Sequence, residues 1–152
     1  MGLTEEAPGV VEQLVNGYSL EAEIYARLLE ISRRQGELLE KDGDLDLCAQ
    51  LFGEKDELLR AITTIEAELE PLKRKWWSQD IPPASRDHLN HILDTVLATI
   101  EQLMAQEQRN EQLLLDHHER VQEELGQVQR GAEMQRSHND QEPLPRFMDV
   151  RR

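Results

Sequence analysis

The sequence predicts an all-α protein: an antiparallel bundle of three long helices with coiled-coil-like packing, whose third helix is the longest and overhangs the others. Large apolar residues recur at alternating spacings of three and four, as in helices that bury one seam against each other. Only 4% of the residues are aromatic, which favours helices packed side by side. A length of 152 residues indicates one domain. We therefore expect a short lead at 1–9, a single helical bundle at 10–136 and a mobile tail at 137–152.

The first helix is expected from about Val10 to Lys41. No proline interrupts this stretch, and its apolar residues keep helical spacing, namely Leu14, Tyr18, Ala22, Tyr25, Leu28, Leu29, Leu38 and Leu39. At the break that follows, Gly43 is expected to take the left-handed conformation that ends a helix, and Asp44 is expected to cap the next helix. A connection this short predicts that the first two helices run antiparallel.

The second helix is expected from about Leu45 to the mid-seventies. Its seam contains Cys48, Leu51, Lys55, Leu58, Ile62, Ile65, Leu69, Leu72 and Trp76. Pro71 removes one backbone hydrogen bond, so a kink or an early end is expected there. Trp77 and its neighbour in the seam point in different directions, and an exposed indole would mark a contact site. Residues 78–85 are expected to form a loop because they contain a Pro-Pro pair, and Ser85 is a suitable cap for the third helix.

The third helix has the longest pattern. Its seam contains Leu93, Val96, Ile100, Leu103, Glu107, Asn110, Leu114, His117 and Val121; Val128 extends it, and Leu125 lies one residue off the phase. The pattern fades after Gly131. At about 1.5 Å per residue, the first two helices are each roughly 45 Å long and the third roughly 70 Å. The segment from His117 to about Arg130 is therefore expected to project beyond the bundle, unless the helix bends back. In the aperiodic tail, Phe147 and Met148 are a candidate docking motif.

Lys55 is the one charged residue in the seam of the second helix, and its burial costs free energy unless it has a partner. By helix length, its level meets Ser32 and Gln35 of the first helix and Glu107 and Asn110 of the third. The sequence therefore predicts one polar layer across an apolar core, with Lys55 facing Glu107. Such layers fix the register of coiled coils. The alternative is that the stem of Lys55 lies along the seam while its ammonium group reaches water.

Composition excludes several classes of partner. The formal net charge of −14 repels nucleic acid and anionic membranes, so neither is expected to bind. The single cysteine, Cys48, allows no internal disulfide and is expected as a small buried residue of the seam. The first ten residues lack the basic and apolar regions of a signal peptide, and no apolar run is long enough for membrane insertion. A cytoplasmic protein is therefore expected.

No pattern of residues predicts catalysis. His88 and His91, with Asp94 one turn further, could form half of a metal site, but a polar helix start is the simpler interpretation. Helical di-iron proteins use Glu-x-x-His pairs, and no histidine here has a glutamate three residues before it. Phosphate-binding glycine loops and nucleophile motifs are missing. We therefore expect no enzymatic activity, no metal and no cofactor.

The stretch from Asp44 to Leu59 resembles the FlgN family of flagellar export chaperones. That family shows a short break carrying Asp, then apolar residues that lead to a Glu/Gln-Lys pair and a Leu-Leu pair, represented here by Asp44, Leu45, Leu51, Phe52, Glu54, Lys55, Leu58 and Leu59. Asn110 followed by Leu113 and Leu114 is similar to the family's Asn-x-x-Leu-Leu on its long last helix. The resemblance covers roughly residues 14 to 130. Cys48 stands where the family usually has leucine, and neither the Trp-Trp pair nor the Pro-Pro loop is part of the family's pattern.

The resemblance implies a cytosolic chaperone without ATPase activity. It would bind hook–filament junction (hook-associated) flagellar subunits, keep them from assembling early and bring them to the flagellar type III export apparatus. The expected binding face is the apolar stripe of the third helix, which an amphipathic client helix would cover and which contains Leu113, Leu114, His117, Val121, Leu125 and Val128. The alternative is a structural coiled-coil scaffold or adaptor that buries the same stripe against its own copies, for example as a homodimer.

Overall fold

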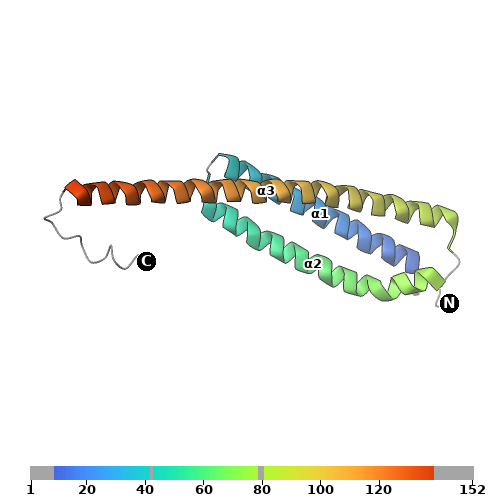
Figure 1. Ribbon diagram of the computed structural model, residues 1–152. Coiled ribbons are helices and arrows are strands. Elements are labelled where there is room, and N and C mark those ends of the chain that lie inside the picture. Colours follow the sequence, from blue (N-terminus) through green and yellow to red (C-terminus); the bar gives the residue numbers. More distant parts are fainter. Residues whose placement is uncertain (1–8, 42, 79–80, 139–152) are drawn as a thin grey trace. The chain divides into compact units, whose positions relative to one another are not determined.

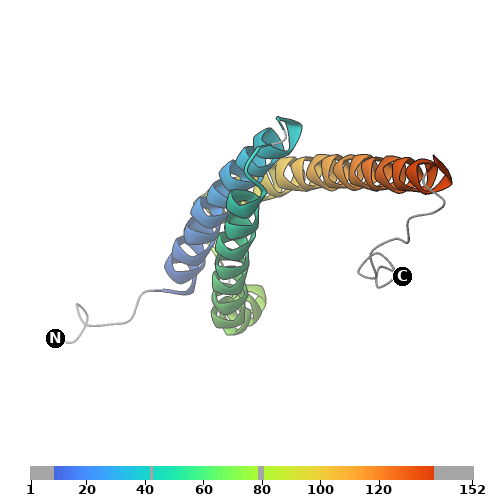
Figure 2. The same ribbon diagram turned by 90° about the vertical axis from the view of Figure 1, so that its left-hand side faces the viewer.

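Three helices form the fold, as predicted. The computed structural model describes residues 9–41, 43–78 and 81–138, which contain α1 (Val10–Glu40), α2 (Leu45–Ser78) and α3 (Pro83–His138) (Figure 1). The helices have 31, 34 and 56 residues, so α3 is the longest. The views of Figures 1 and 2 agree that α1 and α2 lie side by side. Within the described ranges, none of these helices combines the length and the apolarity that a membrane span needs.

The chain divides into two compact units. The first unit, Met1–Leu113, contains α1, α2 and the first part of α3, while the second unit, Leu114–Arg152, contains the rest of α3. All the buried side chains of the described residues lie in the first unit, and Asn110 is the last of them. The boundary between the units therefore falls inside the segment 10–136. The candidate docking motif at 147–148 lies outside the described residues.

The main apolar cluster of the first unit joins all three helices. It contains Leu14 and Tyr18 of α1, Ile65 and Leu69 of α2, and Leu89 of α3. Removing such side chains from water, at about 25 cal/mol per Å² of apolar surface, is the main favourable contribution to folding. Gly17 lets α1 approach α2 closely, because a Cβ atom there would lie 2.5 Å from Cδ2 of Leu69.

The connection between α1 and α2 is short, as predicted, but it uses its glycine differently. Asp44 caps α2, since its Oδ1 accepts a hydrogen bond from the backbone N–H of Leu47 at 3.1 Å. The prediction of a left-handed Gly43 is wrong, because its φ angle lies outside the positive range. Its N–H instead donates to the carbonyl oxygen of Leu38 at 2.7 Å, and a Cβ atom would lie 3.1 Å from the same oxygen. Close approach, rather than backbone handedness, explains this glycine.

Pro71 does not end α2, which continues to Ser78. A proline inside a helix removes one backbone hydrogen bond. Packing around it offsets that loss, because Leu69 belongs to the apolar core and Leu72 and Trp76 pack against it. Of the two outcomes expected at Pro71, a kink or an early end, the early end is wrong.

The start and the end of α3 also differ from the prediction. The helix begins at Pro83, so Ser85 lies inside the first turn and is not the cap. Proline suits the first helical position because its fixed φ is already helical and its missing N–H needs no partner there. At the other end α3 continues past Gly131 to His138, although the apolar pattern has faded. Ala, Glu, Met, Gln and Arg follow that glycine, and all five favour helices.

Candidate functional site

Lys55 is buried, with only 7% of its surface exposed, and groups from two other helices hold its ammonium group. Its Nζ donates a hydrogen bond to Oε1 of Gln35 at 2.9 Å and forms an ion pair with the carboxylate of Glu107. Gln35 in turn donates through Nε2 to the backbone carbonyl oxygen of Cys48 at 3.1 Å. The lysine charge thus has the partner that its burial requires, and one level of the first unit joins all three helices.

Ser32 and Asn110 form a second pair at this level. Nδ2 of Asn110 donates to the backbone oxygen of Ser32 at 2.8 Å and to its Oγ at 3.1 Å. Oδ1 of Asn110 accepts a hydrogen bond from Nε2 of Gln106 at 2.9 Å. The structure therefore brings together all five residues that the sequence placed in a polar layer, and it adds Gln106.

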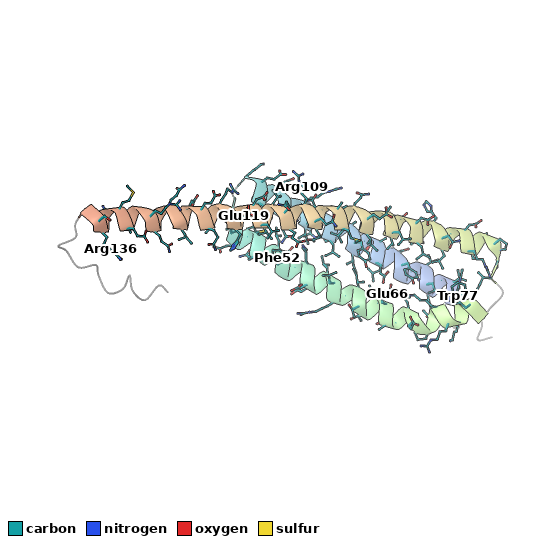
Figure 3. The ribbon with its side chains drawn as sticks, viewed as in Figure 1. Phe52, Glu66, Trp77, Arg109, Glu119 and Arg136 are labelled. Atoms are coloured by element: carbon teal, nitrogen blue, oxygen red, sulfur yellow. The ribbon has the colours of Figure 1, made fainter. Side chains whose placement is uncertain are left out.

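Gly36 permits this arrangement. A Cβ atom at this position would lie 2.6 Å from Nε2 of Gln106 and 2.7 Å from Oδ1 of Asn110. A second link between α1 and α3 lies on the surface, where Arg109, which Figure 3 labels, forms an ion pair with Glu40. Because a larger residue would displace the amide groups, glycine is needed for the close approach of α1 and α3.

A second polar cluster, absent from the sequence-based prediction, lies between α1 and α2. Glu21 is 2% exposed, and its Oε1 has no hydrogen-bond partner among the described residues. Its carboxyl group shares a hydrogen bond with Glu66 of α2, which Figure 3 labels. Glu66 accepts a second hydrogen bond from Nζ of Lys73 at 2.7 Å, and that ammonium group lies 5.6 Å from the ring centroid of Tyr18. An acid pair with one cation therefore lies beside the apolar core.

Burial raises the pKa of Glu21 to about 8, and the hydrogen bond and the charge of Glu66 act in the same direction. Burial also raises the pKa of Glu66, but hydrogen bonds with Glu21 and Lys73 outweigh it and hold this pKa below its usual value. Glu21 thus carries the proton, while Lys73 balances the charge of Glu66. Steps of four, three, four and three residues lead from Leu14 through Tyr18, Glu21 and Tyr25 to Leu28, whereas passing through Ala22 breaks this alternation. Sequence spacing could therefore have found Glu21.

Within the second unit, α3 carries an exposed apolar stripe. The exposed fractions are 37% for Leu114, 39% for Val121, 48% for Leu125 and 63% for Val128. His117, from the same predicted set, is half-buried, and the helix passes through it without a break. The sixth predicted residue, Leu113, is also half-buried and belongs to the first unit.

Two further apolar residues of the second unit, Leu115 and Met134, are exposed by 51% and 72%. They lie off the three-four spacing of the stripe, so spacing does not predict them as part of it. Met134 lies close to the opposite side of the helix from Val121 and Leu125, because each residue advances the helix by about 100°. The stripe itself is therefore a narrow face formed by Leu114, Val121, Leu125 and Val128.

Cys48 and the tryptophan pair take the positions that their spacing indicates. Cys48 is 3% exposed, and burial raises the pKa of its thiol, although the nearby charge of Lys55 opposes the shift. A buried thiol of this kind acts as a small apolar residue. Trp76 packs against the core, and the guanidinium of Arg86 lies 5.8 Å from its ring centroid, whereas Trp77 is 84% exposed.

The histidines near the start of α3 lie on the surface of the first unit. His88, His91 and Asp94 are all exposed. In the part of the chain that the structure describes, no group of three histidine, cysteine, aspartate or glutamate residues is arranged to hold a metal ion.

Comparison with known proteins gives no match for this chain. No model of a protein family matches the chain, and neither a curated protein nor a solved structure is similar to it. The resemblance to flagellar export chaperones therefore rests on the motifs around Lys55 and Asn110 alone.

Proposed function

We propose that this protein is a cytosolic type III export chaperone, which binds hook-associated flagellar subunits through the stripe of α3 and delivers them to the export apparatus. The observation that carries the proposal is the exposure of Leu114, Val121, Leu125 and Val128 on one face of α3, where none of the side chains described after Leu113 is buried. Exposed apolar faces of this kind commonly mark interaction sites. The delivery step rests on the motifs that resemble the chaperone family.

The second unit has the properties of a helix that a partner orders. Most of the stability of a helix in a protein comes from packing of its apolar face, and the exposed stripe lacks such packing. Gly126 and Gly131 each weaken the helix further, by about 1 kcal/mol relative to alanine. Neither glycine is needed for close packing: a Cβ atom at Gly126 would approach only Arg130, at 3.6 Å, and one at Gly131 would meet nothing within 4 Å. An amphipathic client helix laid on the stripe would bury its apolar side chains and offset this weakness.

The affinity expected from this arrangement is modest. Ordering a client helix and the second unit together costs free energy, so we expect dissociation constants on the order of micromolar to tens of nanomolar. A chaperone that must release its client at the export apparatus needs no tighter complex.

The test is a double substitution on the stripe, Val121→Asp with Leu125→Asp, and titration calorimetry with purified hook-associated subunits. Gln127→Asp with Met134→Asp is the matched control, because it adds two acidic groups on the other side of the same helix. We expect the first variant to lose client binding, the control to keep it, and both to melt at the temperature of the unmodified protein. Retained binding by the stripe variant would refute the proposal.

Sedimentation equilibrium separates the chaperone from the self-associating scaffold. A scaffold would bury the stripe against its own copies, so the unmodified protein would form dimers or larger assemblies that the stripe variant loses. A chaperone leaves the stripe available, so we expect a monomer at low micromolar concentration that forms a complex when the subunit is added.

A further inference from the structure

The first unit carries a second set of exposed apolar residues, separate from the stripe of α3. On α2, Leu45, Phe52 and Leu59 are 45%, 44% and 46% exposed. On α3, Leu97 and Met104 are 58% and 60% exposed. Successive members of each set are seven residues apart, which places them on one line along their helix. Both helices thus have an apolar line outside the buried seam.

The two lines flank the ion pair that joins α2 to α3. Nζ of Lys55 lies 4.9 Å from the ring centroid of Phe52, which Figure 3 labels on the first half of α2. Leu59 is one helical turn after Lys55, and Met104 is one turn before Glu107. Since Lys55 and Glu107 bridge the two helices, both lines lie beside the bridge. We call Phe52, Leu59, Leu97 and Met104 the α2/α3 face.

The charges along this face are acidic. Asp56 lies one turn from both Phe52 and Leu59, and Glu101 lies one turn from both Leu97 and Met104. Asp94 and Glu111 continue the line of α3 at its two ends. All four carboxylates are exposed, and none has an ion-pair partner among the described residues. Lys55 is the only basic residue at these spacings, and Glu107 already balances its charge.

This charge pattern selects the occupant. A second copy of the chain would bring the same four carboxylates and a net charge of −14 to the contact, and like charges placed together cost free energy. A helix with lysine or arginine beside its apolar residues would instead pair with them. Two helices with apolar lines at heptad spacing offer the kind of face on which a further helix packs.

We propose that the α2/α3 face docks a basic amphipathic helix of another protein, which packs beside α2 and α3 as a fourth helix. The site lies within the first unit and uses no residue of the stripe, so it does not depend on the proposed chaperone function. Apolar contacts supply the affinity, and Asp56, Glu101, Asp94 and Glu111 select basic over acidic helices.

The test uses two synthetic probes of three heptads, with leucine at the a and d positions and either lysine or glutamate at the flanking positions. Fluorescence anisotropy measures the binding of each labelled peptide to the full chain. We expect the lysine peptide to bind and the glutamate peptide to bind at least about tenfold more weakly. Equal binding of both peptides would overturn the charge selection.

Neutral substitutions then locate the site. Leu59→Gln with Met104→Gln is expected to weaken the binding of the lysine peptide by about tenfold or more, because both side chains lie at the centre of the face. Both residues are exposed, and circular dichroism checks that the fold is kept. Val121→Gln with Leu125→Gln, on the stripe, is expected to leave binding unchanged. Loss of binding in the stripe variant alone would overturn the proposal and place the contact on the second unit.

Charge reversal separates a built site from general attraction. Asp56→Lys with Glu101→Lys is expected to weaken the lysine peptide and to strengthen the glutamate peptide. Glu23→Lys with Glu68→Lys changes the net charge equally at exposed positions away from the face, and is expected to have a much smaller effect. Equal effects of the two charge-reversal pairs on peptide binding would refute a specific site. If the unmodified protein formed a dimer and Leu59→Gln with Met104→Gln made it monomeric, a second copy of the chain would be the occupant.

Discussion

Lys55 donates a hydrogen bond to Gln35 at 2.9 Å across the interface of α1 and α2, while Glu107 of α3 balances its charge. Lys55→Glu would place two carboxylates together in the seam, so we expect it to lower the free energy of unfolding by about 3–5 kcal/mol. Lys55→Leu keeps an apolar stem and leaves the partly exposed Glu107 to water, so the loss should be about 1–2 kcal/mol. Urea unfolding measures both, and equal midpoints would contradict the role of the layer.

Gly36 and Gly53 should respond to alanine in opposite directions. Alanine favours a helix by about 1 kcal/mol over glycine. At Gly53 nothing lies within 4 Å of the new Cβ atom, so Gly53→Ala is expected to gain about that amount. At Gly36 the Cβ atom would lie 2.7 Å from Oδ1 of Asn110, so Gly36→Ala should displace the amide and lose about 1–3 kcal/mol net. Thermal unfolding compares the stability of the two variants. Stabilisation by both would mean that α3 moves away from the new Cβ atom at position 36 without a cost in free energy.

Glu21 should make stability depend on pH. Its pKa rises from 4.5 to about 8 on folding, so the folded chain binds this proton more tightly than the unfolded chain. The resulting contribution is fully present below pH 4.5 and is lost as the pH rises towards about 8. Glu66 acts in the opposite sense, because its lowered pKa stabilises the fold above its usual pKa and the gain is lost as the pH falls. We therefore expect unfolding midpoints to fall from about pH 5 to about pH 8.

Glu21→Gln isolates this contribution, since the amide imitates the protonated acid. In this variant the unfolding midpoint should fall much less between about pH 5 and about pH 8, and the variant should be more stable than the unmodified protein at about pH 8. Glu23→Gln, at an exposed position on the same helix, is the control and should keep the decline. A Glu21→Gln variant with the same pH profile as the unmodified protein would show that another group is responsible.

The first unit should fold without most of the second. All the buried side chains of the described residues precede Leu114, so truncation after Glu119 removes no part of the core. We expect the thermal midpoint to change by only a few degrees, which corresponds to about 1 kcal/mol or less. Truncation after Leu103 removes Glu107 and Asn110 from the polar layer and should lower the midpoint strongly. If the two truncations lowered it equally, the second unit would be contributing to the fold.

The helices and the polar layer were predictable because both follow from spacing. The alternation of three and four residues places Gln35, Lys55 and Asn110 in seams, and helix length alone sets their common level. Charge then selects Glu107 as the partner of Lys55. None of these steps requires knowledge of side-chain rotamers.

Spacing does not predict the outcome where a local cost is offset by tertiary contacts, such as a lost hydrogen bond or a buried carboxyl group. Pro71 removes a hydrogen bond, yet packing of the neighbouring Leu69 and Leu72 keeps the helix intact. Spacing alone places Glu21 in the seam of α1, but it does not show that the carboxyl group can be buried there, because burial depends on its protonation and its hydrogen bond with Glu66. Spacing does not predict the α2/α3 face either, because Phe52 and its neighbours lie outside the buried seam, and the seam is the part of the helix that the apolar pattern defines.

The position of the tryptophans gives the protein a built-in optical reporter. Both indoles of the chain are adjacent at the end of α2, one packed against the core and the other 84% exposed. Intrinsic tryptophan fluorescence thus reports on that end of α2 alone, whereas circular dichroism averages over α1, α2 and α3. A quencher such as acrylamide should suppress the Trp77 component first and leave a blue-shifted Trp76 component. Loss of that component before the loss of ellipticity would show that the bundle opens from this end.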